Sequence, residues 1–83
     1  MVIKWTKLAL SDLNDFRLIS KKSKISEYIM KLFEYSQQLK DFPHLGRIYR
    51  YVKKYIIRRL IYQEHSILYY IDHDIIYIGS CSS

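Results

Sequence analysis

The sequence predicts an α+β fold with an N-terminal strand, a two-helix hairpin and then a mainly antiparallel sheet of three to four strands. Apolar residues recur at helical spacing in the first half of the chain. After Gly46, β-branched and aromatic residues dominate. Only short turns separate the strands of this second half, so they must pair mostly antiparallel.

The composition predicts one folded domain, residues 1–83. The chain has 83 residues, 49% of them hydrophobic, with two glycines and one proline, which excludes a disordered chain. Its single cysteine, Cys81, cannot form an intramolecular disulfide and suits a reducing compartment. No stretch has the apolar length of a signal peptide or the ~20 residues of a membrane span. We therefore expect a cytoplasmic protein without membrane contact.

The N-terminal segment predicts a strand that leads into a helix. Val2–Trp5 is β-prone, with Ile3 and Trp5 on one face, and Thr6 is a competent helix cap. Residues 8–19 then carry an apolar stripe at spacings of three and four. Its members are Ala9, Leu13 and Phe16.

A polar turn and a second helix are predicted to follow. Residues 20–23 reverse the chain, and Ser23 caps the next helix. Leu39 extends the stripe of this helix by about one turn, and Pro43 ends it, because the residue before a proline disfavours helical geometry. The stripe consists of Ile25, Ile29, Leu32, Phe33 and Ser36.

Three segments after Gly46 are predicted strands, at residues 55–62, 66–72 and 75–80. In the middle segment Ile67, Tyr69 and Ile71 share one face, and Leu68 and Tyr70 share the other. His73 and Asp74 form a two-residue hairpin connection without the favoured glycine. Residues 63–65, which include His65, are expected to form the preceding turn.

Several segments, in this order over almost the whole chain, resemble the RelE/ParE superfamily of toxins from type II toxin-antitoxin systems. The resemblance implies a helical hairpin packed on a curved antiparallel sheet, and a cognate antitoxin, usually acidic, that wraps the toxin. The matching segments are Ile3-x-Trp5-Thr6-x-x-Ala9-x-x-Asp12-Leu13, Leu39-x-x-Phe42-Pro43-x-Leu45-Gly46-Arg47, Arg58-Arg59-Leu60-Ile61-Tyr62, Ile67-Leu68-Tyr69-Tyr70-Ile71 and Asp74-Ile75-Ile76-Tyr77-Ile78.

A run of basic and aromatic residues is the main candidate site. The chain has a net charge of +6, which favours an anionic partner. A sheet surface of this composition can hold phosphates by charge and bases by stacking, although it also fits a solvated face or an antitoxin-docking surface. The candidate nucleic-acid or partner-binding residues are Arg47, Tyr49, Arg50, Tyr51, Lys53, Lys54, Arg58 and Arg59.

The resemblance gives only one residue a catalytic role. Arg58 matches the arginine that RNA-cleaving members use on their third strand, where it would stabilise the transition state. His44, His65 and His73 are expected in separate turns without ligand spacing, so no metal or other cofactor is expected. The polar residues Ser11, Asp12, Asn14 and Asp15 are more typical of a helix start than of catalysis.

Three functions follow from the resemblance. The first is a ParE-like toxin that inhibits DNA gyrase by protein contact, without catalytic residues. The second is a RelE-like, ribosome-dependent endoribonuclease that cleaves mRNA. Such members usually carry basic, histidine or tyrosine residues in and after the last strand, where this chain has only residues 79–83, Gly-Ser-Cys-Ser-Ser. The third is a detoxified member that survives as an antitoxin-binding partner. Whether the protein is an enzyme stays open at this point.

Overall fold

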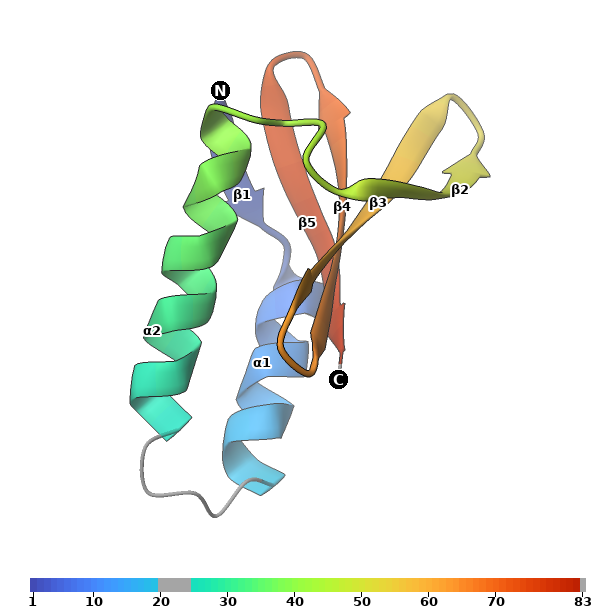
Figure 1. Cartoon of the computed structure of the whole chain (residues 1–83). Helices are drawn as coiled ribbons and strands as arrows, with labels where there is room; N and C mark the ends of the chain where they lie inside the picture. Colours follow the sequence, from blue (N-terminus) through green and yellow to red (C-terminus); the bar gives the residue numbers. More distant parts are fainter. Residues whose placement is uncertain (20–24, 83) are drawn as a thin grey trace.

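The computed structural model describes residues 1–19 and 25–82 and confirms the predicted α+β fold. Two helices lie on the same face of a five-stranded open sheet (Figure 1), whose strand order is β1-β5-β4-β3-β2. The turn predicted at residues 20–23, with its cap Ser23, lies outside the described residues. The elements are β1 (Val2–Trp5), α1 (Lys7–Ile19), α2 (Ile25–Ser36), the 3-10 helix η1 (Gln37–Lys40), β2 (Arg47–Val52), β3 (Tyr55–Tyr62), β4 (His65–Asp72) and β5 (Ile75–Ser82).

The N-terminal strand joins the sheet as its fifth member. Strands β2 to β5 form antiparallel pairs, as predicted, whereas β1 runs parallel to β5 with Val2 opposite Ile75 and Trp5 opposite Ile78. The parallel pair brings the beginning of the chain to the last strand. Helix α1 therefore starts beside β5 and packs against it.

Thr6 links the start of α1 to β5. Its hydroxyl accepts a hydrogen bond from the backbone N–H of Ala9 at 3.3 Å, which is the predicted helix cap, and donates to the Ile78 carbonyl at 2.8 Å. The carboxylate of Asp12 accepts the backbone N–H of Cys81 at 3.2 Å. Asp12 lies in the second turn of a helix that begins at Lys7, so its expected role at the helix start is wrong.

The core lies between the helices and the inner face of the sheet. Leu32 and Ser36 of the predicted stripe on α2 are buried there, and Phe33 packs against this core. Ile25 and Ile29 are only half-buried. Leu39, on η1, is buried where the stripe continues. Trp5 and Phe33 meet edge to face, with ring centroids 4.6 Å apart. The buried apolar residues are Ala9, Leu13, Leu32, Leu39, Leu60, Ile67, Tyr69, Ile76, Ile78 and Cys81.

The predicted two-residue hairpin between β4 and β5 is confirmed. His73 and Asp74 have φ angles of 49° and 64°, so both occupy the left-handed region that such a turn requires. Lys53 and Gln63, in the other two hairpin turns, also have positive φ.

Strand β2 and the part of β3 paired with it form an arm, defined here as residues 47–59. In Figure 1 this arm curves away from the helices, and every residue of β2 is exposed. We call the sheet face that carries the helices the inner face and the opposite one the outer face. Within the described residues, neither helix has the length and apolarity needed to cross a membrane.

Candidate functional site

The strand register divides the basic run between the two faces of the arm. Arg47 lies opposite Arg59, and Arg59 lies opposite Leu68. Arg58 lies opposite the buried Tyr69, so alternation places Arg58 on the inner face and Arg59 on the outer face. The six basic residues therefore do not form one surface.

Three arginines and one tyrosine gather on the outer face of the arm. A register shift between Ile48 and Arg50 gives β2 one extra residue, which brings Tyr49 beside its arginine neighbours. The guanidinium carbons of Arg50 and Arg59 lie 5.7 and 5.8 Å from the centroid of the Tyr49 ring. We call Arg47, Tyr49, Arg50 and Arg59 the arginine patch.

Two hollows border the arginine patch, and both are lined by Tyr49 and Arg59. The larger, of about 310 Å³, is also lined by Arg47, Ile48 and Ile61. The smaller, of about 120 Å³, is lined in addition by Ser66, Leu68 and Ser82. The patch thus combines guanidinium groups with aliphatic walls and hydroxyl groups.

The two lysines of the arm occupy its tip. Lys53 and Lys54 form the exposed turn between β2 and β3, and the Lys54 ammonium lies 5.3 Å from the centroid of the Tyr55 ring. Tyr51 is 69% exposed and lies opposite Ile56, which alternation places on the same face as Arg58.

Arg58 ties the arm to the segment that precedes it. Its Nη1 donates to the Gly46 carbonyl at 2.8 Å and, at 3.4 Å, to that of His44. The Tyr69 hydroxyl accepts the Gly46 N–H at 2.8 Å and donates to the Pro43 carbonyl at 2.9 Å. Residues 41–46, here called the junction, are therefore hydrogen-bonded to both β3 and β4.

A shallow hollow of about 160 Å³ lies beside Arg58. It brings the exposed His44 and Lys54 close to this arginine, although the sequence separates these residues into a turn, a hairpin tip and a strand. Its other lining residues are Tyr55, Ile56 and Ile71. Cations gathered in this way can hold a phosphate group.

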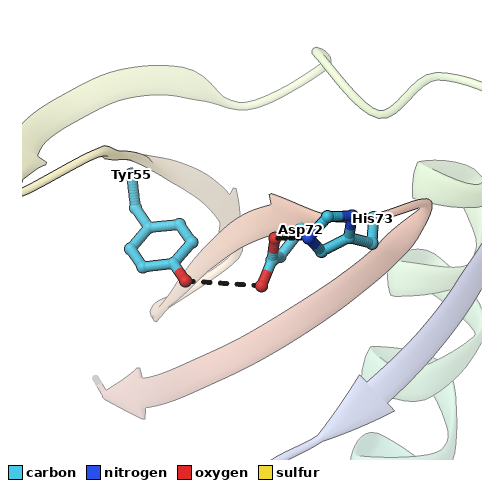
Figure 2. A network of polar contacts seen from close by, with 3 residues as sticks. All are labelled: Tyr55, Asp72 and His73. Carbon is cyan, nitrogen blue, oxygen red and sulfur yellow. Dashed lines mark hydrogen bonds and ion pairs between the residues drawn. The ribbon is translucent and has the colours of Figure 1, made fainter.

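Three tyrosines of β3, β4 and β5 pack in a row on the outer face. The Tyr70 ring lies 4.9 Å from that of Tyr55 and 5.3 Å from that of Tyr77, with which it stacks. Figure 2 shows the Tyr55 hydroxyl turned toward Asp72, whose carboxylate it meets at 3.3 Å, and His73 on the other side of that carboxylate at 3.5 Å. The three rings are engaged with one another, and Tyr55 is also engaged with Asp72.

His65 does not lie in a turn, so that prediction is wrong. It is the first residue of β4, because the turn consists of Gln63 and Glu64 alone. Its side chain is buried, and the residue is 1% exposed. Its Nδ1 lies 2.7 Å from the Tyr28 hydroxyl, and its ring meets that of Phe16 edge to face at 4.5 Å. Among the described residues, no three His, Cys, Asp or Glu side chains are grouped to hold a metal ion.

The burial of His65 predicts that stability falls in mildly acidic solution. Burial lowers the pKa of His65 below 6.5, and the charge of Glu64 opposes this shift only in part. The unfolded chain therefore binds a proton at His65 more readily than the folded chain. The contribution of neutral, buried His65 to the free energy of unfolding is thus present above pH 6.5 and is lost as pH falls through the folded-state pKa. We expect urea unfolding to show this loss, with a slope of at most ~1.4 kcal/mol per pH unit.

One variant tests the assignment to His65. In His65→Gln the dependence of the free energy of unfolding on pH should become flatter below pH 6.5, because the buried imidazole that takes up the proton is gone. An unchanged slope in His65→Gln would contradict the assignment.

Comparison with known proteins places the chain in a family. The model of a family described as "ParE toxin of type II toxin-antitoxin system, parDE" matches residues 3–80. The match includes both helices and reaches from within β1 into β5. No curated protein matches the chain.

Proposed function

The chain belongs to the ParE toxin family and is a toxin of a type II toxin-antitoxin system with a cognate antitoxin, and we propose that its target is DNA gyrase. In this proposal the toxin inhibits gyrase by protein-protein contact, through the arm. The antitoxin neutralises it in the cytoplasm.

The exposed composition of the arm supports a protein target. Arginine and tyrosine are enriched where protein interfaces concentrate their binding energy. The arm presents these types beside aliphatic side chains, with Ile48, Tyr51 and Ile56 all more than two-fifths exposed. A chain that acts by contact requires such a surface and no proton-transferring residue.

Tyr51 gives the sharpest test of gyrase inhibition. We expect the purified toxin to inhibit supercoiling of relaxed plasmid by purified gyrase, and Tyr51→Ala to raise the half-inhibitory concentration about tenfold, as for an interface anchor. Met30→Ala is the matched control, because Met30 is 63% exposed on α2 and Tyr51 is 69% exposed on the arm. Supercoiling that persists in excess toxin would contradict the gyrase target.

A ribosome-dependent endoribonuclease is the second candidate, and the hollow beside Arg58 favours it. Cleavage by a ribose 2′-hydroxyl needs a proton acceptor and cations around the developing negative charge. His44, Lys54 and Arg58 supply these types of group in one place. Arg58 keeps N–H donors for a phosphate group, because a guanidinium has five of them and Arg58 makes two hydrogen bonds to carbonyls.

In vitro translation separates the two candidates. Cuts in ribosome-bound mRNA that vanish in both Arg58→Ala and His44→Ala would establish the endoribonuclease and exclude the gyrase proposal. Unimpaired growth under full induction of the soluble, folded protein would instead contradict both and leave the detoxified member.

A further inference from the structure

The arginine patch carries positive charge that the described part of the chain does not neutralise. Arg47 and Arg59 lie directly opposite each other on paired strands, an arrangement that destabilises a sheet through repulsion. Among the side chains that the structure describes, the one salt-bridge contact joins His73 to Asp72, at the turn between β4 and β5. An anionic ligand would relieve the repulsion.

Tyr49 holds two of these arginines in place. Guanidinium groups stacked on an aromatic ring lose less side-chain freedom when they form further hydrogen bonds. Arg50 and Arg59 are both in this position relative to Tyr49. The patch is thus preorganised toward carboxylate or phosphate oxygen atoms.

The aromatic rings of the outer face disfavour a nucleic-acid strand as that ligand. Base binding on a sheet requires ring faces on which bases can stack. Tyr49 is flanked by the guanidinium groups of Arg50 and Arg59, and Tyr70 packs against Tyr55 and Tyr77. The rings that would bind bases are already engaged within the protein.

The two hollows beside the patch favour a peptide. Ile61 lines the larger hollow and Leu68 the smaller, so each offers an aliphatic wall next to Arg59. A segment that combines carboxylates with aliphatic side chains fills both kinds of surface, and Ser66 and Ser82 provide hydroxyl groups for its backbone.

We propose that the arginine patch and its two hollows are the docking surface for an acidic, aliphatic segment of the antitoxin. This inference rests on the proposed neutralisation by an antitoxin and adds its location, the outer face of the arm and of the adjoining parts of β3, β4 and β5. Arg47 and Arg59 bind carboxylates of that segment, while Ile61 and Leu68 contact its aliphatic side chains.

A binding experiment with a short fluorescein-labelled peptide that alternates leucine with glutamate tests the proposal. We expect the toxin to bind it, and Arg47→Gln/Arg59→Gln to weaken binding at least about tenfold, as for the loss of charge-assisted contacts. Lys31→Gln/Lys40→Gln is the matched control, since it removes the same charge from exposed positions on α2 and η1. This control should change the affinity less than about twofold.

Three outcomes would overturn the proposal. One is an equal loss in both double variants, which would reflect net charge alone. Another is unchanged binding of a peptide in which glutamine replaces glutamate. The third is preferential, Arg59-dependent binding of oligothymidylate, which would make the patch a nucleic-acid site. The supercoiling assay needs no peptide, so the two proposals fail separately. A toxin that inhibits gyrase but does not bind the peptide contradicts only the proposed docking surface. A toxin that binds the peptide but does not inhibit gyrase contradicts only the gyrase target.

Discussion

Replacing Gly46 with alanine should destabilise the protein by about 2–3 kcal/mol, the cost of overpacking a tightly filled site. A Cβ atom at this position would lie 2.7 Å from Cε1 of Tyr69, 2.8 Å from its hydroxyl oxygen and 3.0 Å from the carbonyl oxygen of Arg59. Tyr69 is fully buried and its hydroxyl is hydrogen-bonded on two sides, so the ring cannot move away cheaply. Urea unfolding measures the change in the free energy of unfolding.

The other glycine supplies the control for this substitution. A Cβ at Gly79 would come no closer than 3.9 Å to the Leu68 carbonyl oxygen, an ordinary contact. Gly79→Ala should therefore stay within about 0.5 kcal/mol of the original stability, or gain slightly because the unfolded chain loses freedom. Equal losses in the two variants would show that the close approach of Gly46 to Tyr69 is not the cause.

Local sequence patterns predicted most of the helices and strands. The spacing of Leu32 and Ser36 identifies the buried positions of α2, and the alternation around Tyr69 identifies the inner face of β4. Leu39 is buried as predicted, although the chain has tightened there to a 3-10 helix. These features depend on residues near one another in sequence, so the sequence carries them directly.

Long-range contacts were harder to predict. The parallel pairing of Val2 with Ile75 joins the two ends of the chain, and no local pattern marks it. The polar run Gln63-Glu64-His65 predicts a turn, whereas burial against Phe16 and Tyr28 draws His65 into β4. Tertiary packing decided the position of His65, and a polar residue type alone does not reveal such packing.

The candidate site shows the same limit. The basic run has six basic residues within thirteen positions, but the sheet face that each one occupies depends on strand register. The extra residue in β2 between Ile48 and Arg50 changes which side chains become neighbours, and it brings Tyr49 to Arg59. Because such an irregularity is fixed by pairing across strands, the arginine patch could not be derived from spacing.

Arg58 gains a structural role that its sequence match did not suggest. The resemblance implies catalysis, while the structure adds hydrogen bonds to the junction carbonyls of Gly46 and His44. Loss of activity in Arg58→Ala would therefore combine the loss of a catalytic cation with the loss of the hydrogen bonds that hold the junction. The His44→Ala test is cleaner, because the backbone carbonyl that Arg58 contacts remains in that variant.

Tyr69→Phe should also destabilise the protein by about 2–3 kcal/mol, although it removes a single oxygen atom. The hydroxyl accepts from the buried Gly46 N–H and donates to the Pro43 carbonyl, so its loss leaves a buried donor without a partner. Burial raises the pKa of Tyr69, against the opposing effects of the Gly46 hydrogen bond and Arg58, so the hydroxyl keeps the proton that it donates to Pro43. Urea unfolding again measures the loss, with Tyr70→Phe as control on the outer face.

The two tyrosine variants also test whether the junction holds the arm in position. Tyr70→Phe keeps the ring contacts with Tyr55 and Tyr77 and should stay within about 0.5 kcal/mol. In Tyr69→Phe the Gly46 amide hydrogen should exchange with solvent much faster than the amide hydrogens of the sheet, because its hydrogen bond to the Tyr69 hydroxyl is lost. Gyrase inhibition should weaken with it, although Tyr69 is buried and touches no partner. If the Gly46 amide stayed as protected as the amides of β4, the hydroxyl would not be what secures the arm.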